Sequence, residues 1–483
     1  MAGIGFQLRR LSRQDSISSV VASAGHAAVI AAGPWLFTIF ALAAITLATD
    51  QIAGLTVLSN FRAVVIYSFA LSLVLAAPAT IVATRLVGDT LWLKQPERVK
   101  PLLLGAYLSC LPLVSFGLLL LLALVRPPFE IGLVLSAGTL LVSLIWVALA
   151  FCGAIRDYKG VTLSFLFGLL VSLATTVTVA IQGFGAAGMA WGFLAGLTVT
   201  FFGLTSRVFV TFPHPVPDPM AGARAIADGI GRFAPLVVGA VAGTAGVWID
   251  KWVFWLSPIG ETLESGLLHA PLYDSTMFIA SLGIIPSLSA FVMNLETGFF
   301  ERYQQYYGTI SGNGTLTQIE QARTRLARYT LESLSLITVS QAALAAIIVL
   351  TAPILIDALG LQYRQIAILR YGTLGAVFQF VFIAATSVLL FFDRRYLYVT
   401  LQLMFLVLNG GLTWLSLRAG EDFYGVGYFA ASIIAAAIAY RFADRTFADL
   451  NFLTFIGNNP SVHGAAQGRG RWFDWLLRRV QRA

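Results

Sequence analysis

Charged side chains are scarce in this chain: Asp, Glu, Lys and Arg together make up 11% of its 483 residues. A soluble domain carries about 25% charged residues, so the composition excludes a soluble protein. Hydrophobic residues make up 58%, and many of them form runs of membrane-spanning length. Because backbone polar groups inside a bilayer must be satisfied within the protein, these runs predict an all-α integral membrane protein.

Cysteines and enzyme signatures are also scarce. The 2 cysteines, Cys110 and Cys152, lie within apolar segments, so no disulfide framework is expected. The sequence has no D-x-D acidic pair for a nucleotide-sugar metal. No segment between the apolar runs reaches about 50 residues, the lower size of a folded domain. We therefore expect no enzymatic activity, no cofactor and no metal site.

The apolar runs that are long enough to cross a bilayer, at about 20 residues each, number about twelve. The 31 Lys and Arg residues exceed the 23 Asp and Glu residues. If the N-terminus is cytoplasmic, most of the basic residues fall in cytoplasmic segments, as the positive-inside rule requires, so nucleic-acid binding is not expected. Both termini are therefore predicted to be cytoplasmic. The predicted spans are 19–47, 61–87, 101–125, 128–151, 160–181, 184–210, 233–256, 272–293, 333–356, 365–392, 397–417 and 422–442.

Proline positions match between the first six spans and the last six. Pro34 and Pro235 lie in the first span of each group, and Pro78 and Pro286 lie in the second. The match predicts two pseudo-symmetric six-helix lobes related by a parallel repeat. Because proline inside a helix bends it, these four residues are candidate hinges, with ordinary packing as the alternative. The predicted organisation is an N-terminal lobe (1–210), a cytoplasmic linker (211–232), a C-terminal lobe (233–442) and a basic cytoplasmic tail (443–483).

Ionisable residues within spans are candidate functional groups, because a charge at the bilayer centre costs roughly 2.5–3.5 kcal/mol. The stretch "AGVWIDKWVFWLSP" places Asp250 and Lys251 side by side near the outer end of the seventh span. Adjacent helical residues point about 100° apart, so we expect Asp250 and Lys251 not to pair with each other. Asp250 is expected to turn inward and bond Arg370 or a backbone group as an outer gate. Lys251 is then expected at the headgroups, and interfacial anchoring of both is the alternative. His26, in the first span, is a proton-titrating group or a neutral hydrogen-bonded histidine.

Aromatic residues are plentiful, with 35 Phe, 15 Tyr and 10 Trp. Sugar rings stack on aromatic faces, and sugar hydroxyls need polar partners away from water. For each aromatic residue the alternative is a place against lipid or in the interfacial belt. The candidate sugar-stacking residues are Trp35, Tyr67, Trp146 and Trp191, with Gln379 and Asn409 as polar candidates.

Two segments outside the spans indicate interaction surfaces. The tail "GRGRWFDWLLRRVQRA" spaces its apolar residues as one helix face, and its basic side carries Arg471, Arg478, Arg479 and Arg482. It predicts an interfacial amphipathic helix on anionic lipid or on a protein partner. The inner loop at 294–332 combines aromatic residues, a Gly/Asn-rich turn and a basic helix. It is expected either to dock a cytoplasmic synthase or to lie on the membrane surface.

Three stretches together resemble the Pel exopolysaccharide transporter family (PelG): "MAGIGFQLRRL", "AGPW", and "WIDKWVFWLSPIG" with its acidic outer loop. The resemblance runs over the whole chain. It implies the multidrug/oligosaccharidyl-lipid/polysaccharide (MOP) flippase superfamily and a MATE-like fold with twelve spans in two bundles. It also implies a bacterial inner-membrane exporter of an amino-sugar polymer for the biofilm matrix. The partners it implies are a cytoplasmic glycosyltransferase and membrane subunits that sense cyclic di-GMP.

The leading hypothesis is a transporter that moves a polysaccharide outward through a cavity between the lobes. A cation-coupled small-molecule antiporter is the first alternative, although the first span offers only His26 where such antiporters bury a carboxylate. A membrane scaffold for a polysaccharide synthase is the second alternative.

Overall fold

The computed structural model describes residues 40–155, 157–216 and 218–457. In this part of the chain, 11 helices are long and apolar enough to cross a membrane. They coincide with the predicted spans from 61–87 to 422–442, so the all-α membrane fold is confirmed. The first predicted span, 19–47, lies mostly outside the described residues, and its end belongs to the helix Phe40–Ala53.

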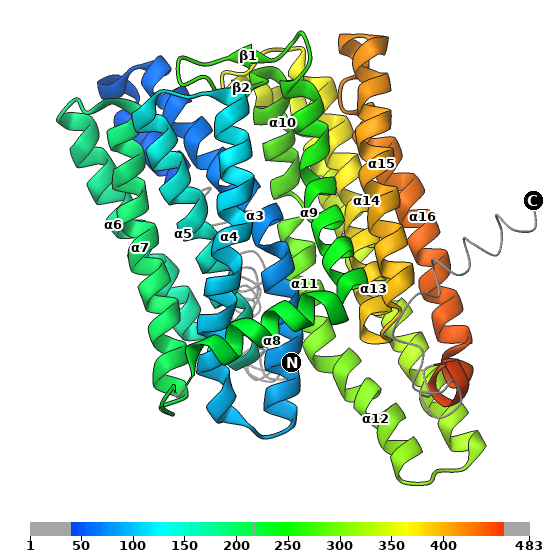
Figure 1. Ribbon diagram of the computed structural model, residues 1–483. Coiled ribbons are helices and arrows are strands. Elements are labelled where there is room, and N and C mark those ends of the chain that lie inside the picture. Colours follow the sequence, from blue (N-terminus) through cyan, green and yellow to red (C-terminus); the bar gives the residue numbers. More distant parts are fainter. Residues whose placement is uncertain (1–39, 156, 217, 458–483) are drawn as a thin grey trace, which may run out of the picture.

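The elements follow the predicted order, with short connections at both ends of the bundle (Figure 1). The first part comprises α3 (Leu55–Trp92), η1 (Pro96–Arg98), α4 (Val99–Val125), α5 (Phe129–Ile155), α6 (Tyr158–Ile181), α7 (Gly185–Thr211) and α8 (Pro219–Arg232). The second part comprises α9 (Ala234–Trp255), β1 (Glu261–Thr262), β2 (Leu268–His269), α10 (Pro271–Leu282), α11 (Ile285–Asn294), the π-helix η2 (Leu295–Phe299), α12 (Phe300–Ser311), α13 (Leu316–Ala358), α14 (Gln365–Phe391), α15 (Arg395–Ala419), η3 (Glu421–Phe423), α16 (Val426–Ala448), α17 (Leu450–Phe452) and η4 (Leu453–Gly457).

The long helices pack as two groups. Helices α3 to α7 pack on one another, as do α9 to α16, and α3 packs against α9 where the groups meet. Strands β1 and β2 lie at one end of the bundle, the strand end, and α12 marks the opposite end, the α12 end (Figure 1). This arrangement accords with two lobes, and the internal repeat between them stays a prediction.

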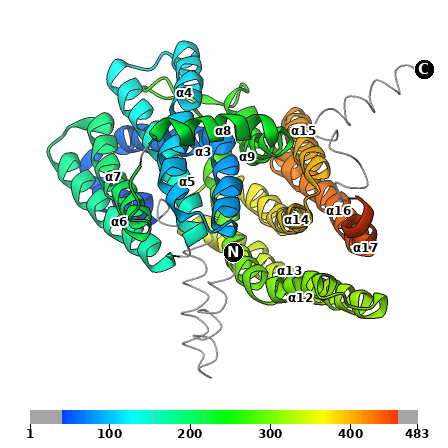
Figure 2. The ribbon, with the colours of Figure 1, turned by 60° about the horizontal axis from the view of Figure 1, so that its bottom comes forward.

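The predicted linker contains the amphipathic helix α8, which packs against α4 and α3 at the α12 end (Figure 2). The helices α4 and α8 touch through glycines. A Cβ atom on Gly105 would lie 2.1 Å from the Gly222 carbonyl carbon, and one on Gly222 would lie 1.8 Å from Pro101 O. Small residues allow such close backbone approach in membrane proteins. This close glycine contact attaches α8, and with it the linker, to the first group of helices.

We expect Gly222→Ala to destabilise the protein by about 1–3 kcal/mol, because its methyl group must separate α8 from α4. Gly231→Ala is the matched control. Gly231 lies in the same helix, α8, and a Cβ atom there would meet no other atom within 4 Å. Alanine exceeds glycine in helix propensity by about 1 kcal/mol, so this control should be neutral or stabilising. The melting temperatures of the two purified variants check the contrast, and equal values would exclude the close contact.

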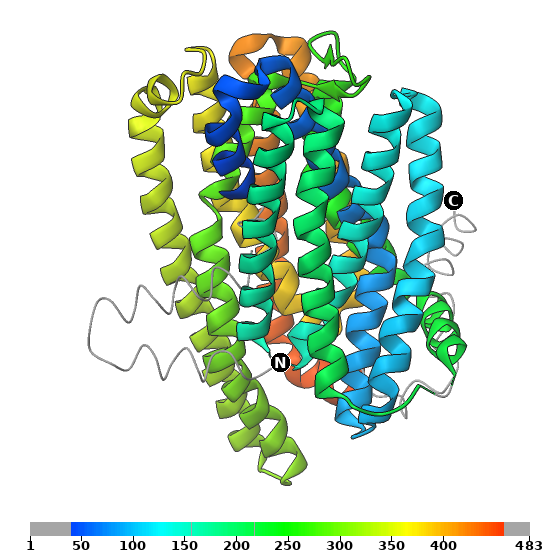
Figure 3. The same cartoon turned by 90° about the vertical axis from the view of Figure 1, so that its left-hand side faces the viewer.

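The predicted turn and basic helix of the inner segment at 294–332 are confirmed, and its aromatic part is helical as well. The helix formed by α11, η2 and α12 turns at Gly312 into α13, which has 43 residues. We call α12 and the facing part of α13 the helical arm, and it extends past the other helices at the α12 end (Figures 1 and 3). A capping box at Thr315 and Gln318 starts α13. The span length alone missed this extension because the arm is amphipathic rather than uniformly apolar.

The helical arm is held by the ends of α14 and α16. The ring of Phe299, the residue of η2 directly before the arm, lies 5.0 Å from the ring of Phe391 at the end of α14. Arg323 donates to Phe447 O and Ala448 O at 3.1 and 2.6 Å, which satisfies carbonyl groups at the end of α16. The arm is thus a built part of the second group.

The candidate hinge prolines have different positions in their helices. Pro78 lies inside α3, as expected. Pro235 lies in the first turn of α9, where proline fits a helix, so the predicted bend within the seventh span is wrong. Pro286 lies in the first turn of α11, directly after the break between α10 and α11. Pro34 is outside the described residues.

Candidate functional site

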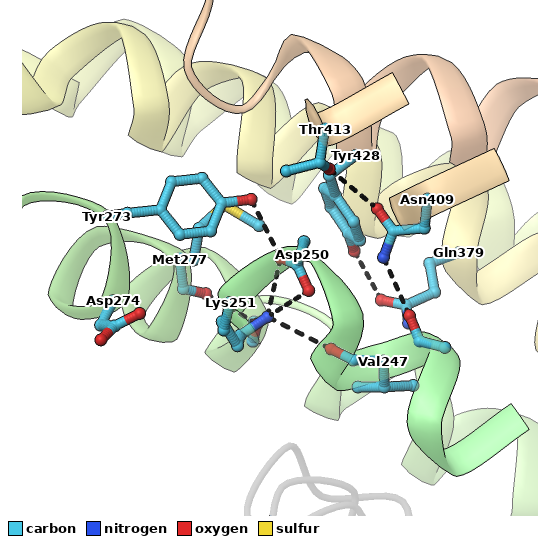
Figure 4. A network of polar contacts seen from close by, with 12 residues as sticks. Val247, Asp250, Lys251, Tyr273, Asp274, Met277, Gln379, Asn409, Thr413 and Tyr428 are labelled. Atoms are coloured by element: carbon cyan, nitrogen blue, oxygen red, sulfur yellow. Dashed lines mark hydrogen bonds and ion pairs between the residues drawn. The ribbon is translucent and has the colours of Figure 1, made fainter. Parts of the chain in front are cut away.

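Asp250 and Lys251 form an ion pair near the strand end of α9 (Figure 4). Asp250 is 0% exposed. Lys251 Nζ lies 2.9 Å from Asp250 Oδ2 and 3.1 Å from Oδ1, and it also donates to Val247 O at 3.3 Å. The prediction that these neighbours would not pair is wrong, because the flexible lysine stem folds back along its own helix.

The predicted partners of this pair are wrong as well. Arg370 is exposed on α14 and donates from Nε to Val349 O at 3.2 Å, so it does not hold Asp250. The Lys251 side chain is 13% exposed, so its ammonium is drawn to Asp250 rather than to the bundle surface. His26 lies outside the described residues.

Helix α10 supplies the second partner of the carboxylate. Tyr273 OH donates to Asp250 Oδ2 at 2.9 Å, and its ring stacks on Phe254 at 3.8 Å between centroids. Asp250 therefore accepts bonds from an ammonium on α9 and a hydroxyl on α10. A buried carboxylate with this many donors links the two helices, and the link depends on its charge.

The next residue, Asp274, is a second carboxylate in this region (Figure 4). Its Oδ2 accepts from Trp255 Nε1 at 2.7 Å and from Ala270 N at 2.9 Å. Its Oδ1 is buried with no hydrogen-bond partner among the described residues. Asp274 thus fixes the start of α10 against the end of α9. Sequence reasoning missed Tyr273 and Asp274, although "HAPLYD" directly follows the acidic outer loop.

His269 and Asp274 also have the H-x(4)-D spacing found in some acyltransferases, which sequence reasoning overlooked. In the structure, His269 Nε2 faces Glu261 Oε2 at 3.6 Å, whereas Asp274 binds Trp255 and Ala270. Burial lowers the pKa of His269, and the Glu261 carboxylate offsets part of this effect. The two residues therefore serve different local contacts instead of forming a His–Asp pair.

The polar candidates Gln379 and Asn409 make contacts between helices of the second group. Tyr428 OH donates to Gln379 Oε1 at 2.5 Å, which joins α16 to α14. Asn409 Nδ2 donates to Gly246 O at 2.8 Å, which joins α15 to α9. Their polar atoms are thus engaged inside the helix bundle (Figure 4).

A set of polar contacts joins the loop at the strand end to α3, and we call it the strand clasp: Asn60, Tyr67, Ser265 and Leu268. Asn60 Oδ1 accepts from Ser265 N at 2.9 Å. Tyr67 OH donates to Leu268 O at 2.8 Å and accepts from Leu268 N at 3.2 Å. Because α3 belongs to the first group and the loop to the second, the strand clasp ties the groups together at this end.

The candidate sugar-stacking residues do not gather at one place. The ring of Tyr67 stacks on Trp255 at 4.6 Å, so one of its faces is covered. Trp146 donates from Nε1 to Ser72 Oγ at 3.2 Å and joins α5 to α3. Trp191 is 44% exposed on α7, and Trp35 lies outside the described residues. Sugar stacking at Tyr67, Trp146 and Trp191 stays a prediction.

A cavity of about 520 Å³ lies between α11, η2 and α13. It is thus formed within the second group of helices, whereas the predicted cavity was between the lobes. Its lining is mixed, with polar and apolar side chains and the guanidinium of one arginine. The lining residues are Pro286, Ser287, Ala290, Met293, Asn294, Thr297, Gly298, Arg302, Tyr329, Leu336, Ile337, Ser340 and Leu344.

Comparison with known protein families is decisive for the class of protein. The profile of the exopolysaccharide exporter family PelG (EPS-E) matches residues 1–455. The chain belongs to the PelG exopolysaccharide exporter family. The comparison with curated proteins found no match.

Solved structures with a similar fold are MATE transporters. An outward-facing multidrug resistance MATE family transporter of the MOP superfamily has a TM-score of 0.63 at 16% identity, covering 88% of this chain and 96% of that chain. MATE in complex with MaD5 has a TM-score of 0.63 at 15% identity, covering 94% and 100%. MATE in the bent conformation has a TM-score of 0.61 at 15% identity, covering 94% and 99%. The predicted MATE-like architecture is confirmed, and at these identities the likeness shows the fold alone.

Proposed function

We propose that this PelG family member exports the amino-sugar polymer Pel across the bacterial inner membrane, from cytoplasm to periplasm, for the biofilm matrix. The observation that carries the proposal is the PelG family match over residues 1–455 of a chain with a transporter fold. The positive-inside pattern supports a cytoplasmic α12 end and a periplasmic strand end. Polymer therefore enters at the α12 end and leaves at the strand end.

The strand clasp then closes the exit. Its contacts join α3 of the first group to the loop between α9 and α10 of the second. The bond from Tyr273 to Asp250 joins α10 to α9 beneath that loop, and Lys251 neutralises the carboxylate within α9. When the groups rock apart, α9 and α10 move as a body and the clasp opens. Asp250 is in this view a positioning residue of the exit.

We propose that the partners implied by the family bind at the α12 end. The helical arm offers a cytoplasmic glycosyltransferase a rigid helical surface, because its base is fixed by Arg323 to the end of α16. Membrane subunits that sense cyclic di-GMP would contact the same complex. The basic tail, with its four arginines beyond Gly470, would lie on anionic lipid.

Reconstitution tests the proposal. Vesicles with this chain, the polymer synthase and its sugar nucleotide should accumulate polymer on the side of the strand end, where an added glycosidase degrades it. Vesicles with the synthase alone should keep all polymer on the synthase side. In cells, deletion of the chain should leave cytoplasmic synthesis intact and abolish surface polymer. Equal polymer translocation with and without the chain would contradict the proposal.

A small-molecule antiporter is the second candidate, because the similar solved structures are MATE transporters, one of them described as a multidrug resistance transporter. Such a protein would bind its coupling cation at a buried carboxylate. The Asp250 carboxylate is already neutralised by the ammonium group of Lys251, whose Nζ lies 2.9 Å from Asp250 Oδ2. The lysine competes with an external ion at this position, so we rank the antiporter second. Uptake of cationic dyes by the same vesicles under a sodium or proton gradient distinguishes the two functions.

A further inference from the structure

The cavity between α11, η2 and α13 changes in character along its length. Toward the α12 end its lining is polar, with Asn294, Thr297, Arg302 and Tyr329. Farther along the same helices, toward the strand end, most of the lining is apolar, with Leu336, Ile337 and Leu344, and it also includes Ser287 and Ser340. From Tyr329 to Leu344 is 15 residues of α13, or about 22 Å at 1.5 Å per residue. The cavity is therefore amphipathic along the axis of the bundle.

The polar part of the cavity lies where the spans end. Phe299, one turn before Arg302, packs on Phe391 at 5.0 Å, and Phe391 is the last residue of α14. The turn that follows carries the exposed ion pair of Asp393 and Arg395. Charged turns between spans mark the membrane surface, so Arg302 lies at the depth of lipid headgroups. The apolar part of the cavity then extends into the hydrocarbon region.

Arg302 contacts a backbone carbonyl group and an aromatic ring. Its Nη1 donates to Gly298 O at 2.8 Å, and its guanidinium carbon lies 3.6 Å from the centre of the Tyr329 ring. The π-turn at η2 helps to place these groups, and such turns in helices are frequent at functional sites. An arginine held flat on an aromatic ring presents its remaining N–H groups to a phosphate.

We infer that this cavity binds a membrane phospholipid with an anionic headgroup, whose phosphate meets Arg302 and whose acyl chain lies along Met293, Leu336 and Leu344. A polar end with one cation, followed by an apolar channel toward the membrane centre, matches the order of groups in such a lipid. The side chain of Leu336 is 69% exposed, which leaves the channel wall open to an acyl chain. The cavity volume is in the range of about 300–1,000 Å³ typical of small-molecule sites. The inference does not depend on the polymer that is exported.

Lipid binding to the purified full-length chain in neutral detergent tests the inference, with native mass spectrometry as the readout. Phosphatidylglycerol should bind about tenfold or more tightly than phosphatidylcholine of the same acyl chains. Both phosphates can accept from Arg302, but the choline cation of phosphatidylcholine opposes the guanidinium charge. Glycerol 3-phosphate, which has the charge without the chains, should not compete at equal concentration. Competition by it would indicate a free-phosphate site and overturn the lipid assignment.

Three variants separate the headgroup from the chain. Arg302→Gln should lower the affinity for phosphatidylglycerol about tenfold, to that for phosphatidylcholine, whereas Arg302→Lys should keep a preference for the anionic lipid. Ser340→Phe, which fills the exposed apolar part, should weaken binding of both lipids. Arg328→Gln is the control, since the Arg328 side chain on α13 is 79% exposed and pairs with Glu332. Equal effects of the Arg328 and Arg302 variants, or no lipid preference in the wild type, would overturn the inference.

Discussion

Lys251→Met lowers the free energy of unfolding by about 3–5 kcal/mol, because it leaves the buried Asp250 carboxylate without its cation. Asp250 is 0% exposed, so water cannot replace the lysine. The hydroxyl of Tyr273 remains as a donor at 2.9 Å, but a hydroxyl does not neutralise a charge. A large fall in melting temperature of the purified protein, together with loss of polymer export, is the expected result.

A double-mutant cycle separates the charge from the shape of the side chains. Asp250→Asn combined with Lys251→Met removes both charges, and the new amide oxygen can still accept from Tyr273. The double variant should therefore recover most of the stability that Lys251→Met loses. If it is no more stable than the single variant, the ion pair is not the cause of the loss.

An exposed ion pair at the same end of the bundle supplies the control. Arg364 Nη1 lies 2.7 Å from Glu421 Oε2, and their side chains are 69% and 55% exposed. Arg364→Gln should cost less than about 1 kcal/mol, since water solvates the remaining carboxylate. The difference between the stability losses of Lys251→Met and Arg364→Gln then measures the effect of burial, because both changes remove one cation from a close ion pair.

A disulfide across the strand clasp stops polymer export. Asn60→Cys and Ser265→Cys place thiols where Asn60 Oδ1 now accepts from Ser265 N at 2.9 Å. Oxidation would then lock the first group of helices to the second at the strand end. If polymer leaves by separation of the groups at this end, export in vesicles should fall at least about tenfold, since a covalent bond replaces a hydrogen bond worth roughly 1 kcal/mol.

Reduction and single-cysteine variants are the controls for this experiment. Dithiothreitol should restore export by the double variant, and each single variant should export under oxidising conditions. The native Cys110 and Cys152 are buried, so they do not compete for the new thiols. Full export by a chain shown to be cross-linked would exclude opening at the strand clasp and leave the exit elsewhere.

Spans and fold class were predictable because bilayer thickness sets a length and a polarity that any spanning helix must meet. The turn and the basic helix of the helical arm were also predicted. Helix α12 was not, since its residues alternate between a buried face around Tyr306 and an exposed polar face that no length rule detects. The hinge at Pro235 failed for another reason. The predicted span 233–256 already placed this proline in the first turn of α9, where proline fits a helix without bending it.

The sequence alone therefore determined a MATE-like membrane protein of the PelG family, through the length and polarity of its apolar runs and the stretches that carry the resemblance. It also marked Asp250 and Lys251 as costly charges near the outer end of a span. Only the tertiary structure decided how they are neutralised, because side-chain reach and the approach of Tyr273 from α10 are not properties of one helix. The strand clasp and the cavity beside Arg302 likewise join residues from separate helices, and packing alone brings them together.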